Sequence, residues 1–197
     1  MENNQPLAEK NHLRIRNMVQ AAVFLALGLV LPFATGQIPQ IGKMLLPMHI
    51  PVLLCGMICG GGYGMIVGII CPLLRSVLFG MPAIFPNAVA MAFELGTYGF
   101  VSGFLYSRSK WQCVVAVEKC LVAAMIAGRL VWGVVMYILM AVTGSAFTLQ
   151  LFLAGAFVNA VPGIILQLIL IPVCMLALNR AGLVPFRRSS GAKRAVN

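Results

Sequence analysis

The sequence predicts an all-α integral membrane protein, a compact bundle of six transmembrane helices with both termini in the cytoplasm. Hydrophobic residues make up 61% of the 197 residues and charged residues 9%, against about 45–50% and about 25% in soluble domains. So few charges cannot cover a water-soluble globule. Six helices of roughly 20 residues each would use about 120 residues. The remainder suffices for short loops and tails, so residues 1–197 are expected to form a single membrane domain.

The apolar runs define the helices in order. The first is expected to be a retained helix and not a signal peptide, because no small-x-small cleavage site follows it. Gly60–Gly64 is expected to be a tight turn between the second and third helices, and Gly80–Pro86 a proline-rich turn before the fourth. Prolines 162 and 172 are expected to kink or interrupt the sixth. The expected helices cover residues 18–34, 48–59, 65–79, 87–106, 112–142 and 147–178, with a basic tail over 180–197.

The distribution of Lys and Arg sets the orientation. The formal net charge is +10, and most of the basic residues flank apolar runs, which indicates membrane topology and not nucleic-acid binding. With the N-terminus in the cytoplasm, only Lys43 falls outside. The basic residues that then fall inside are Lys10, Arg14, Arg16, Arg108, Lys110, Lys119, Arg180, Arg187, Arg188, Lys193 and Arg194. The outer loop Thr35–Pro47 is either a lid or a passive connection.

Few charged residues fall inside the expected helices. Arg75, Glu94 and Arg129 do, and Glu118 lies near the inner end of the fifth helix. A charge in mid-bilayer costs at least about 2.5–3.5 kcal/mol, so these side chains are expected to face the protein interior. Helical spacing groups polar residues into stripes on three helices: Asn87, Met91, Glu94 and Tyr98; Arg129, Trp132 and Met136; Asn159, Gly163 and Gln167. Such stripes are typical of a site for a small polar ligand.

Two interpretations of these charges stay open. Glu94 could pair with Arg75 or Arg129 and lock helix packing, but one Glu cannot neutralise both arginines. The remaining positive charge favours a ligand with a carboxylate or phosphate, although a Glu beside aromatic residues could instead bind an amino or imino group on a ring. His49 by itself is expected to be a hydrogen bonder at the start of a helix.

No enzyme or metal-site pattern is present in the sequence. There is no P-loop, zinc-protease or serine-hydrolase motif, and Asp is absent. The six cysteines are expected to be small packing residues and not disulfides or metal ligands. We therefore expect no enzyme activity, no cofactor and no metal. Transport against a gradient would need energy from an ion or from another protein.

As a set, these features resemble the substrate-binding (S) subunits of energy-coupling factor (ECF) transporters, which import vitamins and related micronutrients. The resemblance covers about residues 14–179. It rests on the six helices, on Ala22-x-x-x-Ala26, on the long first outer loop, on Met48-His-Ile-Pro51 and on the Gly61-Gly-Tyr-Gly64 turn. In that turn, glycines replace the Pro and Lys of the family's usual Gly-Pro-Lys-Tyr-Gly.

The resemblance implies a function. The chain would capture a small water-soluble vitamin, with an anionic, pantothenate-like one as first guess, at the plasma membrane of a prokaryote. Ala22 and Ala26 would dock on a membrane coupling subunit that works with two ATPases, and Thr35–Pro47 would be the lid. The residues expected to line the pocket or lie near it are Arg75, Asn87, Glu94, Tyr98, Arg129, Trp132, Asn159 and His49.

Three other functions are considered. A self-sufficient secondary transporter would show internal repeats and ion-coupling residues at the midplane, and no convincing repeat is present. An intramembrane enzyme using Glu94 or His49 would need a second catalytic group within reach. The third alternative is a purely structural membrane subunit.

Overall fold

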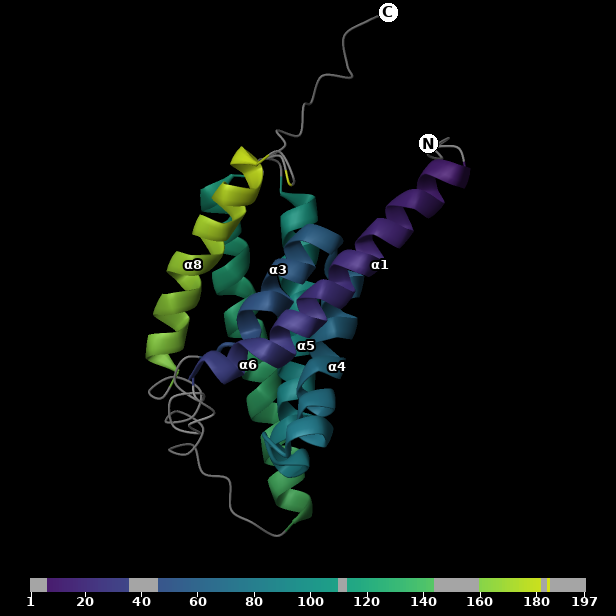
Figure 1. Ribbon diagram of the computed structural model, residues 1–197. Coiled ribbons are helices and arrows are strands. Elements are labelled where there is room, and N and C mark those ends of the chain that lie inside the picture. Colours follow the sequence, from purple (N-terminus) through teal and green to yellow (C-terminus); the bar gives the residue numbers. More distant parts are fainter. Residues whose placement is uncertain (1–6, 36–45, 110–112, 144–159, 182–183, 185–197) are drawn as a thin grey trace, which may run out of the picture.

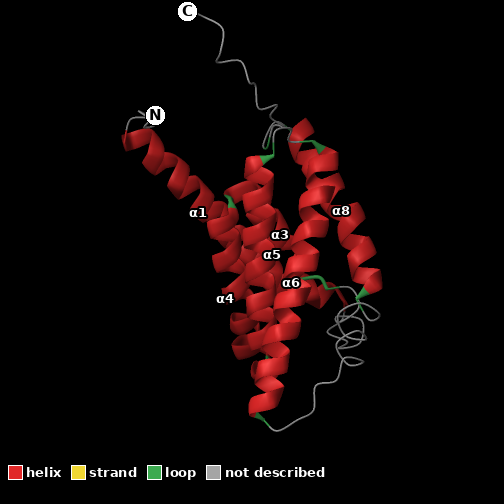
Figure 2. Cartoon of the chain, turned by 180° about the vertical axis from the view of Figure 1, so that it is seen from behind, coloured by secondary structure: helices red, strands yellow, loops and turns green. Residues whose placement is uncertain are grey.

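The computed structural model describes residues 7–35, 46–109, 113–143, 160–181 and 184, and this part of the chain contains helices and no strand (Figure 2). The expected all-α class is therefore confirmed. The α-helices are α1 (Leu7–Val30), α3 (His49–Cys59), α4 (Gly61–Phe79), α5 (Val89–Arg108), α6 (Val114–Val142) and α8 (Val161–Arg180). A 3-10 helix, η1 (Leu31–Thr35), follows α1, and a π-helical turn, η2 (Ile84–Ala88), precedes α5.

The expectation of six transmembrane helices is wrong in one respect, because only five of the described helices are long and apolar enough to cross a membrane. The exception is α3, which has 11 residues. It is therefore about 16 Å long, about half of the roughly 30 Å hydrocarbon core. Ten of its residues are buried, and it packs against α1, α4, α5 and α8. Its apolar sequence reflects burial in protein and not contact with lipid.

Several helix ends also differ from expectation. Helix α1 begins at Leu7 and not at residue 18, because its first turns are polar and hydropathy detects only the part that lies in lipid. Helix α8 begins at Val161, so Pro162 stands in its first turn, where proline is tolerated, while Pro172 lies inside the helix. The part of the expected sixth helix before residue 160, the segment 36–45 of the outer loop, and the basic tail, apart from residues 180, 181 and 184, lie outside the described residues.

The predicted glycine turn is shorter than expected. Only Gly60, with φ of 101°, separates α3 from α4, and Gly61–Gly64 are already helical. Gly64 is used for packing: a Cβ atom there would lie 2.6 Å from the Gly56 Cα of α3 and 2.7 Å from the Gly99 carbonyl oxygen of α5. Glycines thus bring the backbones of α3, α4 and α5 into direct contact, the arrangement that membrane helices use in the absence of a hydrophobic driving force.

The bundle has two distinct ends. The N-terminal end of α1 and the C-terminal end of α8 lie at the same end (Figure 1), together with the connection from α5 to α6. The outer faces expose apolar side chains, for example Val134 on α6 at 61% and Ile169 on α8 at 62%, as expected of surfaces that face lipid. The core cluster joins α3, α5, α6 and α8 through residues such as Leu53, Tyr98, Leu121 and Ile171.

Candidate functional site

Glu94 is the centre of a buried polar cluster. It is the sixth residue of α5 and is 2% exposed. Its Oε1 atom lies 2.9 Å from Arg129 NH1 on α6 and accepts a 3.0 Å hydrogen bond from the Tyr98 hydroxyl one turn further along α5. The same oxygen lies 3.7 Å from His49 Nε2 on α3. Three helices therefore bring a carboxylate, a guanidinium, a phenol and an imidazole together inside the bundle.

His49 reaches Glu94 because α3 begins inside the bundle. It is the first residue of α3, and its backbone N–H donates to the Leu46 carbonyl at 3.1 Å. The His49 and Tyr98 rings are tilted against each other with centroids 5.3 Å apart. The His49 side chain makes no hydrogen bond at the start of the helix, since both ring nitrogens lack a partner in the described structure. It faces Glu94 instead.

The position of Tyr98 depends on Gly128. A Cβ atom on Gly128 would overlap Cε1 and Cδ1 of the Tyr98 ring. Because Gly128 lacks that atom, the ring lies directly against the α6 backbone, next to Arg129. A glycine in α6 thus sets the spacing between the two helices that carry the cluster.

The cluster holds more hydrogen-bond donors than it uses. Within the described part of the chain, both His49 ring nitrogens and Arg129 Nε and NH2 are buried without a hydrogen-bond partner. Outside the four side chains of the cluster, the same holds for Gln167 Nε2 on α8. Leaving such a group unsatisfied costs about 1–3 kcal/mol, and more for a charged group. Gln167 is 1% exposed and lies one turn before Ile171 on α8, which packs in the same core cluster as Tyr98. These unsatisfied groups are what a polar ligand would pair with.

The structure separates Arg75 from this cluster. Its NH1 atom donates a 2.6 Å hydrogen bond to the Leu29 carbonyl at the end of α1. Its guanidinium carbon lies 5.2 Å from the centroid of the Phe33 ring and 5.4 Å from that of Phe79. Arg75 therefore joins the end of α1 to α4. Of the two arginines considered as partners of Glu94, Arg129 forms the ion pair.

The other expected pocket residues have different positions. Asn87 lies in η2 and is exposed, so it is not part of the buried cluster. Trp132 is half-buried on α6, three residues after Arg129. Asn159 lies outside the described residues. Gln167 belongs to the stripe recognised in the sequence but was absent from the expected site.

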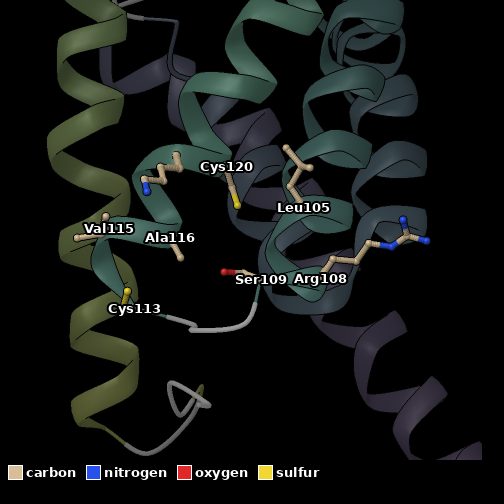
Figure 3. A pocket seen from close by; sticks show the side chains of 8 residues that line it. Leu105, Arg108, Ser109, Cys113, Val115, Ala116 and Cys120 are labelled. Atoms are coloured by element: carbon tan, nitrogen blue, oxygen red, sulfur yellow. The ribbon is translucent and has the colours of Figure 1, made fainter. Parts of the chain in front are cut away.

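An open cavity of about 490 Å³ lies at the other end of α5 and the start of α6 (Figure 3). It is lined by Arg108, Ser109, Cys113 and Lys119, among others, and contains none of the expected site residues. Arg108 is 14 positions after Glu94 on α5, a distance of about 21 Å along the helix. This cavity is therefore distinct from the buried cluster.

Helix α1 presents two different faces. Ala21 and Gly28 are buried, and a Cβ atom on Gly28 would lie 2.7 Å from the Cys71 sulfur of α4, so this face packs inward. Ala22 and Ala26 are exposed on the opposite face. These two small side chains lie among exposed apolar residues such as Val19 and Val23, and a second helix could approach closely at the two alanines.

Comparison with known proteins agrees with the helical architecture. A family model described as "ECF transporter, substrate-specific component" matches residues 16–175 of the chain. The matched region runs from α1 into α8 and includes Glu94, Arg129 and His49. No curated protein and no solved structure matches the chain.

Proposed function

Because the chain belongs to the substrate-specific components of ECF transporters, a family of transport subunits and not of enzymes, we propose that it captures a small water-soluble vitamin or related micronutrient at the Glu94 cluster. The observation that carries this assignment is the set of buried nitrogens without a hydrogen-bond partner on His49 of α3 and Arg129 of α6, the two side chains that face Glu94. Gln167 on α8 is taken as a further member of the site in this proposal. A group that merely locked helices together would have its hydrogen bonds satisfied by protein. In a binding site without its ligand, the hydrogen-bonding groups that contact the ligand have no partner.

The solute enters from outside and the termini are cytoplasmic in this proposal. In the described residues, Arg14, Arg16, Arg108, Lys119 and Arg180 all belong to the end of the bundle at which α1 begins and α8 ends (Figure 1). The positive-inside rule supports a cytoplasmic location for that end. Glu94 lies near the start of α5, toward the opposite end, which would then face the outside.

Substrate release requires a partner in this proposal. The chain contains no nucleotide-binding motif, so the energy comes from a membrane coupling subunit with two ATPases. The exposed face around Ala22 and Ala26 on α1 supports close docking of a partner helix. This proposal leaves Arg75 and Asn87 out of the solute site, since one is bonded to Leu29 and the other is exposed and apart from the buried cluster.

Reconstituted uptake tests this function. Vesicles holding the chain together with a coupling subunit and its ATPases should accumulate the bound solute only with ATP, and vesicles with the chain alone should not. Ala22→Trp should leave solute binding intact and abolish uptake, because a large side chain keeps the partner helix away. Val134→Trp, at an exposed position on α6, is the matched control and should transport normally. Accumulation by the chain alone, driven by an ion gradient, would instead identify a secondary transporter.

A further inference from the structure

Arg129 has one satisfied and one unsatisfied side. Its NH1 atom is held 2.9 Å from Glu94 Oε1, whereas Nε and NH2 are buried without a hydrogen-bond partner among the described residues. In a guanidinium group, Nε–H and one N–H of NH2 leave the same edge in parallel. The two unsatisfied donors of Arg129 therefore form a planar pair, the arrangement that binds a carboxylate with two hydrogen bonds.

We propose that this edge of Arg129 binds the carboxylate of the captured solute, and that the solute is a small monocarboxylate that also carries amide or hydroxyl groups. The inference rests on the function proposed above and adds the chemical class of the substrate and the atoms that recognise it. It does not depend on a second arginine, since Arg75 is bonded to Leu29.

The charges of the cluster favour a carboxylate over a phosphate. The described cluster contains one positive group, Arg129, and one negative group, Glu94, which already form an ion pair. A phosphate monoester would bring up to two further negative charges into a buried site, and a carboxylate brings one. His49, 3.7 Å from Glu94, is the remaining group there that can carry positive charge. The site is therefore suited to a monoanion.

The remaining groups of the solute are inferred from His49, and from Gln167 on α8 if it faces the same site, as proposed above. Both His49 ring nitrogens and the Gln167 amide nitrogen are buried without a partner in the described structure. A protonated imidazole offers two donors, and an amide nitrogen offers two donors as well. Hydroxyl and amide groups on the solute can pair with both, whereas an unsubstituted hydrocarbon chain would leave them unsatisfied.

Glu94 is a positioning residue in this arrangement. Its Oε1 atom holds Arg129 NH1 and accepts the Tyr98 hydroxyl at 3.0 Å, so the guanidinium plane is set before the solute arrives. Preorganised donors of this kind avoid the cost of ordering a long side chain on binding. Glu94→Gln, whose amide oxygen can still accept from NH1, should keep the preference for an acid, whereas Glu94→Ala should lose it.

Matched pairs of acids and neutral analogues test the proposal by calorimetry on the purified full chain. The pairs are pantothenate and panthenol, nicotinate and nicotinamide, biotin and biotin amide, and lipoate and lipoamide. One acid should bind, with its neutral analogue about 100-fold weaker, as expected when a buried charged hydrogen bond is lost. Arg129→Gln should remove this difference, and Arg129→Lys should restore only part of it, because an ammonium lacks the parallel donors.

The controls separate folding from binding. Arg108→Gln makes the same substitution at an exposed arginine on the far end of α5, and its affinity for the acid should equal that of the wild type. The comparison of acid with neutral analogue in the wild type needs no variant, so it decides the question even if Arg129→Gln does not fold.

Three results would overturn the proposal: a neutral analogue that binds within about tenfold of its acid, a solute without a carboxylate as the tightest binder, or binding of none of the four acids. An uncharged micronutrient bound by the wild type would refute the substrate class while leaving the capture function intact. If the chain binds none of the eight compounds and purifies without any bound molecule, the capture function fails as well.

Discussion

Removing the charge of Glu94 should destabilise the protein because it leaves the buried Arg129 without its ion-pair partner. Glu94→Gln leaves the buried Arg129 guanidinium without its carboxylate, and Arg129→Gln leaves the carboxylate without its cation. The two side chains are 2% and 8% exposed, so water can compensate neither loss. The double variant removes both charges together and leaves no unpaired ion.

The size of the effect follows from this geometry. With an N–O distance of 2.9 Å, the charge centres are about 4 Å apart, which gives about 4 kcal/mol at an effective dielectric constant of about 20. Breaking a buried pair by removing one partner typically costs about 3–5 kcal/mol. Each single variant should therefore lose about that much free energy of unfolding. The double variant should lose less than the sum, with a coupling energy of about 2–3 kcal/mol.

The assay is a double-mutant cycle on the free energy of unfolding, measured by SDS titration in mixed micelles. The matched control is a second cycle in which Arg75→Gln replaces Arg129→Gln. Because Arg75 donates to the Leu29 carbonyl and not to Glu94, that cycle should be additive within about 0.5 kcal/mol. Additivity in the Arg129 cycle, or coupling in the Arg75 cycle, would refute the assignment of the ion pair.

Three further outcomes follow from the same contacts. Gly128→Ala should lower the free energy of unfolding by about 1–3 kcal/mol, because its Cβ overlaps the Tyr98 ring, and should weaken binding of the co-purifying solute in a titration. Its control, Gly62→Ala, adds a methyl group where nothing lies within 4 Å and should be neutral or slightly stabilising; equal losses in both variants would contradict the packing argument. Gln167→Leu removes a buried amide whose nitrogen is unsatisfied, so its melting temperature should hold or rise while affinity for the solute falls about tenfold, the effect of one lost hydrogen bond; unchanged affinity would exclude Gln167 from the site.

Hydropathy predicted the fold class and located all six described α-helices, but it could not measure how each helix is covered. Helix α3 is as apolar as a membrane span, yet it is 11 residues long and enclosed by protein. The start of α1 was missed for the opposite reason, since a helix that continues beyond the lipid carries polar residues. Hydropathy shows which residues avoid water. It does not show whether protein or lipid covers them, and it does not show where a helix continues into water.

Members of the candidate site could be predicted where an ionisable residue falls within an apolar helix, because a charge is costly there. Glu94 and Arg129 stand out in the sequence for that reason, and the i+4 spacing adds Tyr98. The same logic also selected Arg75, whose partners are a backbone carbonyl and two aromatic rings. Which interior charges meet depends on the rotation of each helix, and that is set by contacts such as Gly128 against Tyr98.

The most direct test of the central claim is native mass spectrometry of the chain purified alone in detergent, without coupling subunit or ATPase. The wild type and Arg108→Gln should each carry a small water-soluble molecule at a ratio near one to one, and Arg129→Gln should carry none. A wild-type chain that purifies empty and gives no thermal shift with a panel of vitamins and their precursors would contradict a capture subunit built around Glu94.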